Sequence, residues 1–197
     1  MTKGDPLDDW LSSQSAKVHR RPKRLMDVIR EAYPIGVPAF IVKTQTDRLG
    51  SSGGYAFHLG TPDDVLRRIC SWLLTNGHGD VLVKLIEELW GRHGREEVAI
   101  AALLLANIQS IHDEEAWGIL ASIIGGSEPA DALLLVIEEL FRAKRSAPPS
   151  DVLLDWYRCR DIRAHLALLV QHAAWIRSGR VRLDEDCLLY TSPSPRD

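Results

Sequence analysis

The sequence lacks the long apolar run that a membrane helix requires. None of its hydrophobic stretches approaches the roughly 20 residues needed to cross a bilayer. Its N-terminus, MTKGDPLDDW, is acidic and polar, whereas a secretory signal peptide begins with basic and then apolar residues. We therefore expect a cytoplasmic protein with no membrane partner.

Cysteine is scarce, and a phosphate-binding loop is absent. Only Cys70, Cys159 and Cys187 occur, and their spacing matches neither a zinc site nor a redox pair, which favours a reducing compartment. The glycine- and serine-rich segment from Gly50 to Gly54 is followed by Tyr-Ala, where a P-loop has Lys and then Ser or Thr. We interpret that segment as a structural loop, and we expect no cofactor.

The apolar residues that are present recur at three- and four-residue steps, which predicts helices. With 197 residues and 45% hydrophobic content, the chain is long enough for a domain that buries roughly two-thirds of its unfolded surface. Capping residues, Gly and Pro divide the pattern into segments. The expected helices cover residues 23–32, 61–76, 80–90, 96–108, 114–124, 128–144, 150–158 and 161–178.

The stretch from Asp80 to Ile111 is the expected centre of the fold. It reads as two helices joined by a tight turn, in which Gly91 and Gly94 both favour the left-handed conformation that ends a helix. The second helix is apolar on nearly all sides from Val98 onward. Neighbouring helices must therefore cover it on both sides.

Local signals also predict how individual elements begin. Thr61 has the position of an N-cap, with Pro62 as the first helical residue. Ser127 has the position of the N-cap before Glu128, with Pro129 in the first turn of that helix. The residues 39–42 have a composition compatible with a strand, although no partner strand is evident elsewhere.

The helices form pairs that start near Asp80, Asp113 and Ser150, a spacing of about 33 to 37 residues. This rhythm predicts an all-α fold, an α-solenoid of stacked antiparallel helix pairs spanning residues 21–186. Residues 1–20 are expected to form an N-terminal arm or a short helix.

The last eleven residues, CLLYTSPSPRD, match codon for codon a translated transposase-type sequencing adapter. We expect residues 187–197 to be a non-native tail and the solenoid to be truncated at its C-terminal end. A native Ser/Pro-rich tail is the alternative.

Positive charge is concentrated in two segments. The segment from Leu140 to Arg182 contains nine Lys or Arg residues and three Asp residues. A second basic run extends from Lys17 to Arg24. Solvated helix faces are one interpretation of these segments, and a surface for phosphate groups is the other.

Three stretches resemble the AlkD-like DNA alkylation repair family of HEAT-like helical repeats. They are GTPDDVLRRI at residues 60–69, LIEELWGRHGREEVAIAALLLANI at residues 85–108, and the segment at residues 156–167. The resemblance covers residues 23–179. It implies that duplex DNA lies in a basic concave groove and that the N-glycosidic bond of cationic alkylpurines is hydrolysed. Such chemistry needs a carboxylate and an aromatic face near an oxocarbenium-like sugar.

The family's functional residues are matched only in part. Its Trp-x-x-x-Asp motif falls on SEPAD, which keeps Asp131 but has Ser127 in place of the aromatic residue. Its later Ser-x-Asn-x-Trp-x-Arg-Arg pattern falls on CRDIRAHL, with Arg163 at the Trp position and His165 and Leu166 at the Arg pair. Asp131 is thus a candidate catalytic residue, or else an acid that complements the dipole of its helix.

The resemblance leads to two hypotheses. The first is a monomeric protein that binds duplex DNA, and is a glycosylase if its site is active, with phosphate contacts from Arg142, Lys144, Arg145, Arg158, Arg160, Arg163 and His165. The second is a non-catalytic helical scaffold that binds a protein partner. His165 and His172 share a helical face, but no third ligand accompanies them, so packing or DNA contact is favoured over metal binding. Trp117 and Trp156 are the aromatic candidates for a groove.

Overall fold

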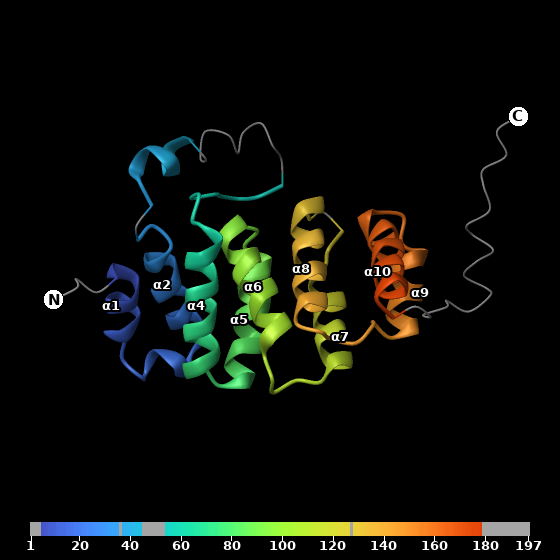
Figure 1. The fold of residues 1–197 in the computed structure, drawn as a ribbon, viewed down its shortest axis with the longest axis horizontal. Coiled ribbons are helices and arrows are strands. Elements are labelled where there is room, and N and C mark those ends of the chain that lie inside the picture. Colours follow the sequence, from blue (N-terminus) through green and yellow to red (C-terminus); the bar gives the residue numbers. More distant parts are fainter. Residues whose placement is uncertain (1–4, 36, 45–53, 127, 179–197) are drawn as a thin grey trace, which may run out of the picture. The chain divides into compact units, whose positions relative to one another are not determined.

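Every regular element that the structure describes is a helix, which confirms the all-α class (Figure 1). The structure is a computed structural model, and it describes residues 5–35, 37–44, 54–126 and 128–178, the last seven by backbone alone. The expected cap at Ser127 and the expected non-native tail lie outside these residues. None of the described helices combines the length and apolar character needed to cross a bilayer.

From α4 onward the helices follow one another along the chain with short connections, whereas residues 45–62 separate α4 from the helical residues before it. Residues 39–44 are also helical. The remaining elements are α1 (Pro6–Ser12), the 3-10 helix η1 (Val18–Arg20), α2 (Pro22–Ala32), α4 (Asp63–Asn76), α5 (Gly79–Gly91), α6 (Arg95–Asn107), α7 (Asp113–Ile123), α8 (Ala130–Arg142), α9 (Ser150–Arg158) and α10 (Ile162–Ser178).

The chain divides into two compact units. The first contains Met1–His112 and Ser127–Arg145, and the second contains Asp113–Gly126 and Ser146–Asp197. The chain therefore leaves the first unit to form α7, returns to it for α8, and leaves it again for α9 and α10.

The first unit is built in two layers of helices around α6. Helices α4, α6 and α8 lie alongside one another in one layer, while α2 and α5 pack together behind them (Figure 1). All residues from Glu96 to Ala106 are buried, because α4, α5 and α8 cover three sides of α6. Each fully buried Leu or Ile contributes about 2 kcal/mol, so tertiary packing rather than helix propensity holds α6 in place.

The second unit is organised around two tryptophans. Trp117 on α7 and Trp156 on α9 are both buried and meet edge to face, with ring centroids 6.4 Å apart. The Trp117 indole N–H donates to the Ser146 carbonyl at 2.9 Å, and the Asp113 carboxylate accepts from the Ser146 N–H at 2.9 Å. These bonds fix the entry to α9 relative to α7, and α10 packs on α9.

The start of α4 differs from the sequence prediction by one position. Thr61 was expected to be the N-cap, but Pro62 occupies that position and the Thr61 side chain makes no cap. Instead the buried Thr61 hydroxyl donates to the Tyr33 carbonyl at 3.0 Å. A buried hydroxyl needs a buried partner, and here a tertiary contact with the end of α2 outweighs the local capping bond.

Helix α8 also starts later than predicted. It begins at Ala130 rather than at Glu128, and Pro129 is its N-cap. Glu128 is buried and its carboxylate accepts a hydrogen bond from the Trp90 indole N–H at 3.3 Å. The acid that seemed to open the helix is therefore a tertiary partner of α5.

Two local backbone predictions were wrong. The residues 39–42 are helical and not extended: the N–H groups of Ile41 and Val42 both donate to the Pro38 carbonyl, at 2.9 and 3.3 Å. The left-handed residue that ends α5 is His93, with φ of 54°, and not one of the two glycines. Gly94 is required for a different reason, since a Cβ there would lie 2.2 Å from the Phe57 ring.

Candidate functional site

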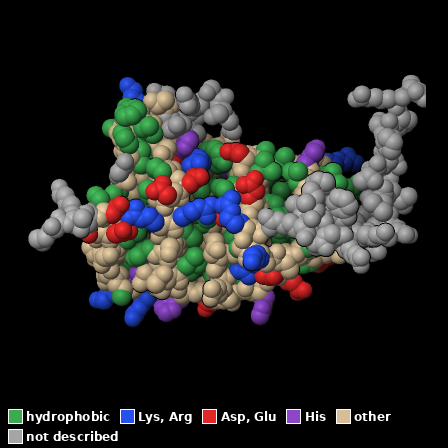
Figure 2. Space-filling view, viewed as in Figure 1, with side chains coloured by type: hydrophobic (Ala, Val, Ile, Leu, Met, Phe, Trp, Pro, Cys, Tyr) green, Lys and Arg blue, Asp and Glu red, His purple; other side chains and the backbone are tan. Residues whose placement is uncertain are grey.

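Two arginines converge on one buried carboxylate on the face formed by α4, α6 and α8. Arg67 of α4 reaches across α6 and donates to both oxygens of Glu139 on α8, at 2.6 and 3.2 Å. Arg142, one turn further along α8, donates to the same Oε1 atom. Figure 2 shows Lys and Arg side chains in a row from α4 across α6 to α8, with Asp and Glu side chains beside it.

These three side chains differ in burial, and the difference determines which of their charges are exposed to solvent. The Glu139 side chain is only 3% exposed, whereas those of Arg67 and Arg142 are 44% and 58% exposed. The hydrogen bonds that Arg67 donates to Glu139 raise the pKa of Arg67 above its ordinary value. Two cations share one anion, so the cluster carries a net positive charge, and its exposed edges are guanidinium groups. Such a surface suits a phosphate or another oxyanion.

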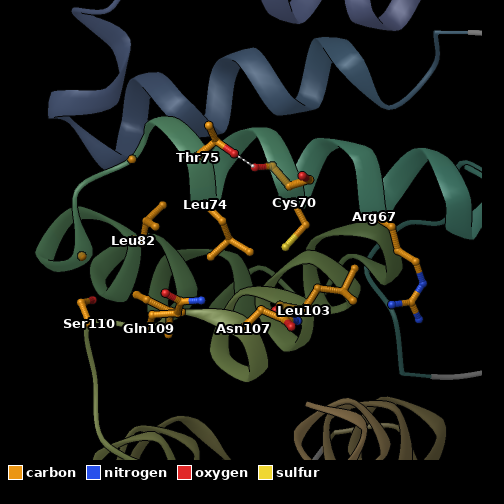
Figure 3. A pocket seen from close by; sticks show the side chains of 13 residues that line it. Arg67, Cys70, Leu74, Thr75, Leu82, Leu103, Asn107, Gln109 and Ser110 are labelled. Carbon is orange, nitrogen blue, oxygen red and sulfur yellow. Dashed lines mark hydrogen bonds between the residues drawn. The ribbon is translucent and has the colours of Figure 1, made fainter.

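A groove between α4 and α6 begins at Arg67 (Figure 3). It has a volume of about 610 Å³, and among the described residues Arg67 is the one charged residue in its lining. Its lining also contains apolar and thiol side chains, amides and hydroxyls. The lining consists of Arg67, Cys70, Ser71, Leu74, Thr75, Gly77, Gly79, Leu82, Leu103, Asn107, Ile108, Gln109 and Ser110.

Asp131 lies at a different place in the first unit, in the first turn of α8. Its Oδ2 atom accepts a hydrogen bond from the Tyr55 hydroxyl at 2.9 Å. Burial, helped by this bond, raises the pKa of Tyr55 well above its ordinary value, so the phenol keeps its proton. Burial also lowers the pKa of the nearby His58. A carboxylate, a phenol ring and an imidazole are thus gathered at this end of α8.

The segment before α4 is held in place by a buried carboxylate in the first turn of α6. Glu96 is fully buried, and its Oε1 atom accepts from the N–H groups of Leu59, Gly60 and Thr61, at 3.0, 3.0 and 3.3 Å. Among the residues that the structure describes, its Oε2 atom has no hydrogen-bond partner. By anchoring this loop on α6, Glu96 positions Tyr55 and His58 near Asp131.

The predicted phosphate-contacting residues of the first unit differ in what they do. Arg142 and Lys144 are exposed. Arg145 instead serves the fold: its half-buried guanidinium donates to carbonyls at the end of α6 and just beyond it, those of Ala106, Ile108 and Ile111. These carbonyls have no partner within the helix, so Arg145 satisfies them as a C-terminal cap.

In the second unit the predicted residues are also unequal. Arg158, Arg160 and His165 are exposed. Arg163 donates to both oxygens of Asp161, the shortest bond being 2.6 Å, and this pair lowers the pKa of Asp161. Arg163 is therefore occupied by a neighbour two positions away.

The tryptophans expected at a groove belong to the core. Trp117 is 0% and Trp156 is 3% exposed, so neither offers a ring face to a ligand. The described residues also contain no group of three or more His, Cys, Asp or Glu arranged to hold a metal ion. The side chain of His172, the expected neighbour of His165, lies outside what the structure describes.

Sequence reasoning missed Arg67, Glu139 and Tyr55. Glu139 carried one usable signal, because an acid next to Leu140 on the apolar stripe of α8 needs a buried partner. Nothing local indicated that the partner would come from α4. Tyr55 gave no signal, since it follows the glycine-rich loop.

Comparisons with protein-family models, with curated proteins and with solved structures found no match for this chain. The fold and the site must therefore carry the functional argument by their own geometry.

Proposed function

We propose that this protein binds duplex DNA through the face formed by α4, α6 and α8. The observation that carries the proposal is the Arg67–Glu139–Arg142 cluster, in which a buried carboxylate holds two half-exposed guanidinium groups close together. A phosphate accepted between them would relieve the repulsion of two like charges. Lys144, at the end of α8, adds an exposed third cation.

The resemblance to the AlkD-like family supports the same ligand and adds an architectural proposal. In this proposal the repeats of an α-solenoid are antiparallel helix pairs, each with one helix in either layer of the first unit, and α9 and α10 are a further repeat pair. Arg158, Arg160 and His165 then supply additional phosphate contacts. The free thiols Cys70 and Cys159 support a reducing, cytoplasmic setting.

Binding of a fluorescent duplex at increasing KCl concentration tests the proposal. The logarithm of the affinity should fall linearly with the logarithm of the salt concentration, because phosphate contacts release counterions. Arg142→Gln and Lys144→Gln should each weaken binding and reduce the slope by about one unit. Lys84→Gln removes an exposed cation from α5 and should leave both values unchanged.

Absence of duplex binding, or an affinity that does not change with salt, would overturn the proposal. That result would favour the alternative of a helical scaffold for a protein partner.

Glycosylase activity is a second candidate function, and the contact between Asp131 and Tyr55 favours it. The family's aromatic residue is absent at Ser127, but the tertiary structure places a phenol ring beside the candidate carboxylate. A carboxylate stabilises an oxocarbenium-like sugar by its charge, and a ring face stabilises a cationic base.

Release of 7-methylguanine from a methylated duplex tests this second candidate. Asp131→Asn should abolish release because the amide lacks the negative charge. Tyr55→Phe keeps the ring and should retain most of the activity, whereas Tyr55→Ala should lose it. If the unaltered protein releases no base, the enzymatic candidate is wrong while DNA binding stands.

A further inference from the structure

The groove between α4 and α6 has an uneven distribution of charge along its length. Arg67 lies at one end of it and Ser110 at the other, with Asn107 and Gln109 between them on the α6 side (Figure 3). The rest of the lining is uncharged. A ligand that complements this groove has one negative group and an uncharged body with hydrogen-bonding edges.

The groove's uncharged polar side chains are of the kind that read nucleobase edges. Asn and Gln amides pair with donors and acceptors of unpaired bases, and Ser and Thr hydroxyls serve either role. The Asn107 amide donates to the Leu103 carbonyl at 2.8 Å, which fixes the orientation of that side chain. The Thr75 hydroxyl is likewise fixed by donating to the Ser71 carbonyl at 2.8 Å.

The floor and the size of the groove are also compatible with a planar organic group. Cys70, Leu82 and Leu103 contribute sulfur and apolar carbon, on which a base can lie. The volume of about 610 Å³ falls within the range of about 300–1,000 Å³ that is typical of small-ligand sites. Arg67 joins this groove to the arginine cluster, so that a phosphate on Arg67 places its own nucleotide at the groove entrance.

We propose that the α4–α6 groove receives one unpaired nucleotide of the bound DNA, with its phosphate on Arg67 and its base against Asn107 and Gln109. This inference rests on the proposed function, because it specifies which DNA the α4–α6–α8 face prefers. Extrusion of a base costs least where the base is already unpaired. The protein therefore selects duplexes that contain a bulged nucleotide.

Fluorescence anisotropy with two hairpin duplexes tests the inference, one fully paired and one identical except for a single unpaired adenine. The full chain should bind the bulged hairpin about tenfold more tightly, a difference of about 1.4 kcal/mol. Asn107→Ala combined with Gln109→Ala should remove this preference and leave affinity for the paired hairpin unchanged.

Asn76→Ala is the matched control. The Asn76 amide donates to the Trp72 carbonyl at 2.9 Å, the same bond that Asn107 makes on α6, but Asn76 does not line the groove. This variant loses the same helix-end bond and should keep the preference for the bulged hairpin. A chain that binds both hairpins equally would overturn the inference and leave the proposed function intact. A preference that survives in the Asn107/Gln109 variant would overturn it too. Failure to bind either hairpin would overturn the proposed function itself.

Discussion

Arg67 and Glu139 are 72 positions apart in the sequence, yet the guanidinium of one holds both carboxylate oxygens of the other, at 2.6 and 3.2 Å. The pair links the two outer helices of the α4–α6–α8 layer across α6. It therefore has two roles, since it ties α8 to the rest of the first unit and fixes the arginines that we assign to phosphate binding.

Removal of the shared carboxylate should destabilise the protein. Glu139→Ala leaves Arg67 and Arg142 without their common partner and leaves space beneath them. Breaking a fully buried ion pair costs about 3–5 kcal/mol, and because both arginines are half exposed we expect a loss of about 1–3 kcal/mol. Urea unfolding monitored by circular dichroism measures it. Glu138→Ala, at the exposed neighbouring position, is the control, and equal losses for both variants would contradict a special role for Glu139.

Lys144→Gly should stabilise the fold and weaken DNA binding in the same protein. Lys144 has φ of 61°, and the Arg145 N–H donates to the Leu140 carbonyl at 3.0 Å, which closes a Schellman turn after α8. Glycine adopts this conformation without the strain that a Cβ causes, a gain of about 1 kcal/mol. Ala143→Gly, next to it at φ of −74°, should instead destabilise. Thermal unfolding of both variants gives the comparison, and a loss of stability in Lys144→Gly would refute the prediction.

Gly91 and Gly94 border one turn, and their replacement by Ala should have opposite effects. A Cβ on Gly91 has nothing within 4 Å, so Gly91→Ala should stabilise α5 by about 0.5–1 kcal/mol. A Cβ on Gly94 would lie 2.2 Å from the Phe57 ring, so Gly94→Ala should cost about 1–3 kcal/mol. Chemical denaturation of the two variants side by side measures both effects, and effects of the same sign would contradict the close approach of Gly94 to the Phe57 ring.

Glu97 should make stability depend on pH. Burial raises the pKa of this carboxyl above its ordinary value of 4.5, although Arg92 and Arg30 act in the opposite direction. The folded protein then holds the Glu97 proton more tightly than the unfolded chain does. Its contribution is present below pH 4.5 and is lost as the pH rises through the folded-state pKa.

The variant Glu97→Gln cannot titrate at this position and removes the effect. The free energy of unfolding of Glu97→Gln should therefore rise relative to the unaltered protein as the pH increases above 4.5. Urea unfolding at several pH values measures the difference between the two proteins. Parallel pH profiles would mean that burial does not perturb this carboxyl.

Several features of the fold followed from the sequence because they depend on neighbouring residues. The periodicity of apolar residues predicted α5 and α6, and the uninterrupted apolar run from Val98 required helices around α6, which α4, α5 and α8 provide. The end of α4 at Asn76 was predicted, and the end of α9 was expected at about Arg158, where it lies. Helix formation and termination are short-range properties, so a local pattern is sufficient to read them.

The tertiary structure alone decided which polar groups are buried and what they contact. Local rules made Thr61 an N-cap and indicated no tertiary partner for Glu96, but a buried hydroxyl and a buried carboxylate must find partners wherever the fold supplies them. Those partners, the Tyr33 carbonyl and a row of N–H groups before α4, come from segments distant in the sequence. The same holds for the candidate site. The sequence determined that this chain is helical and where it carries positive charge, whereas packing of α4, α6 and α8 decided that Arg67 and Arg142 share one buried acid beside a groove.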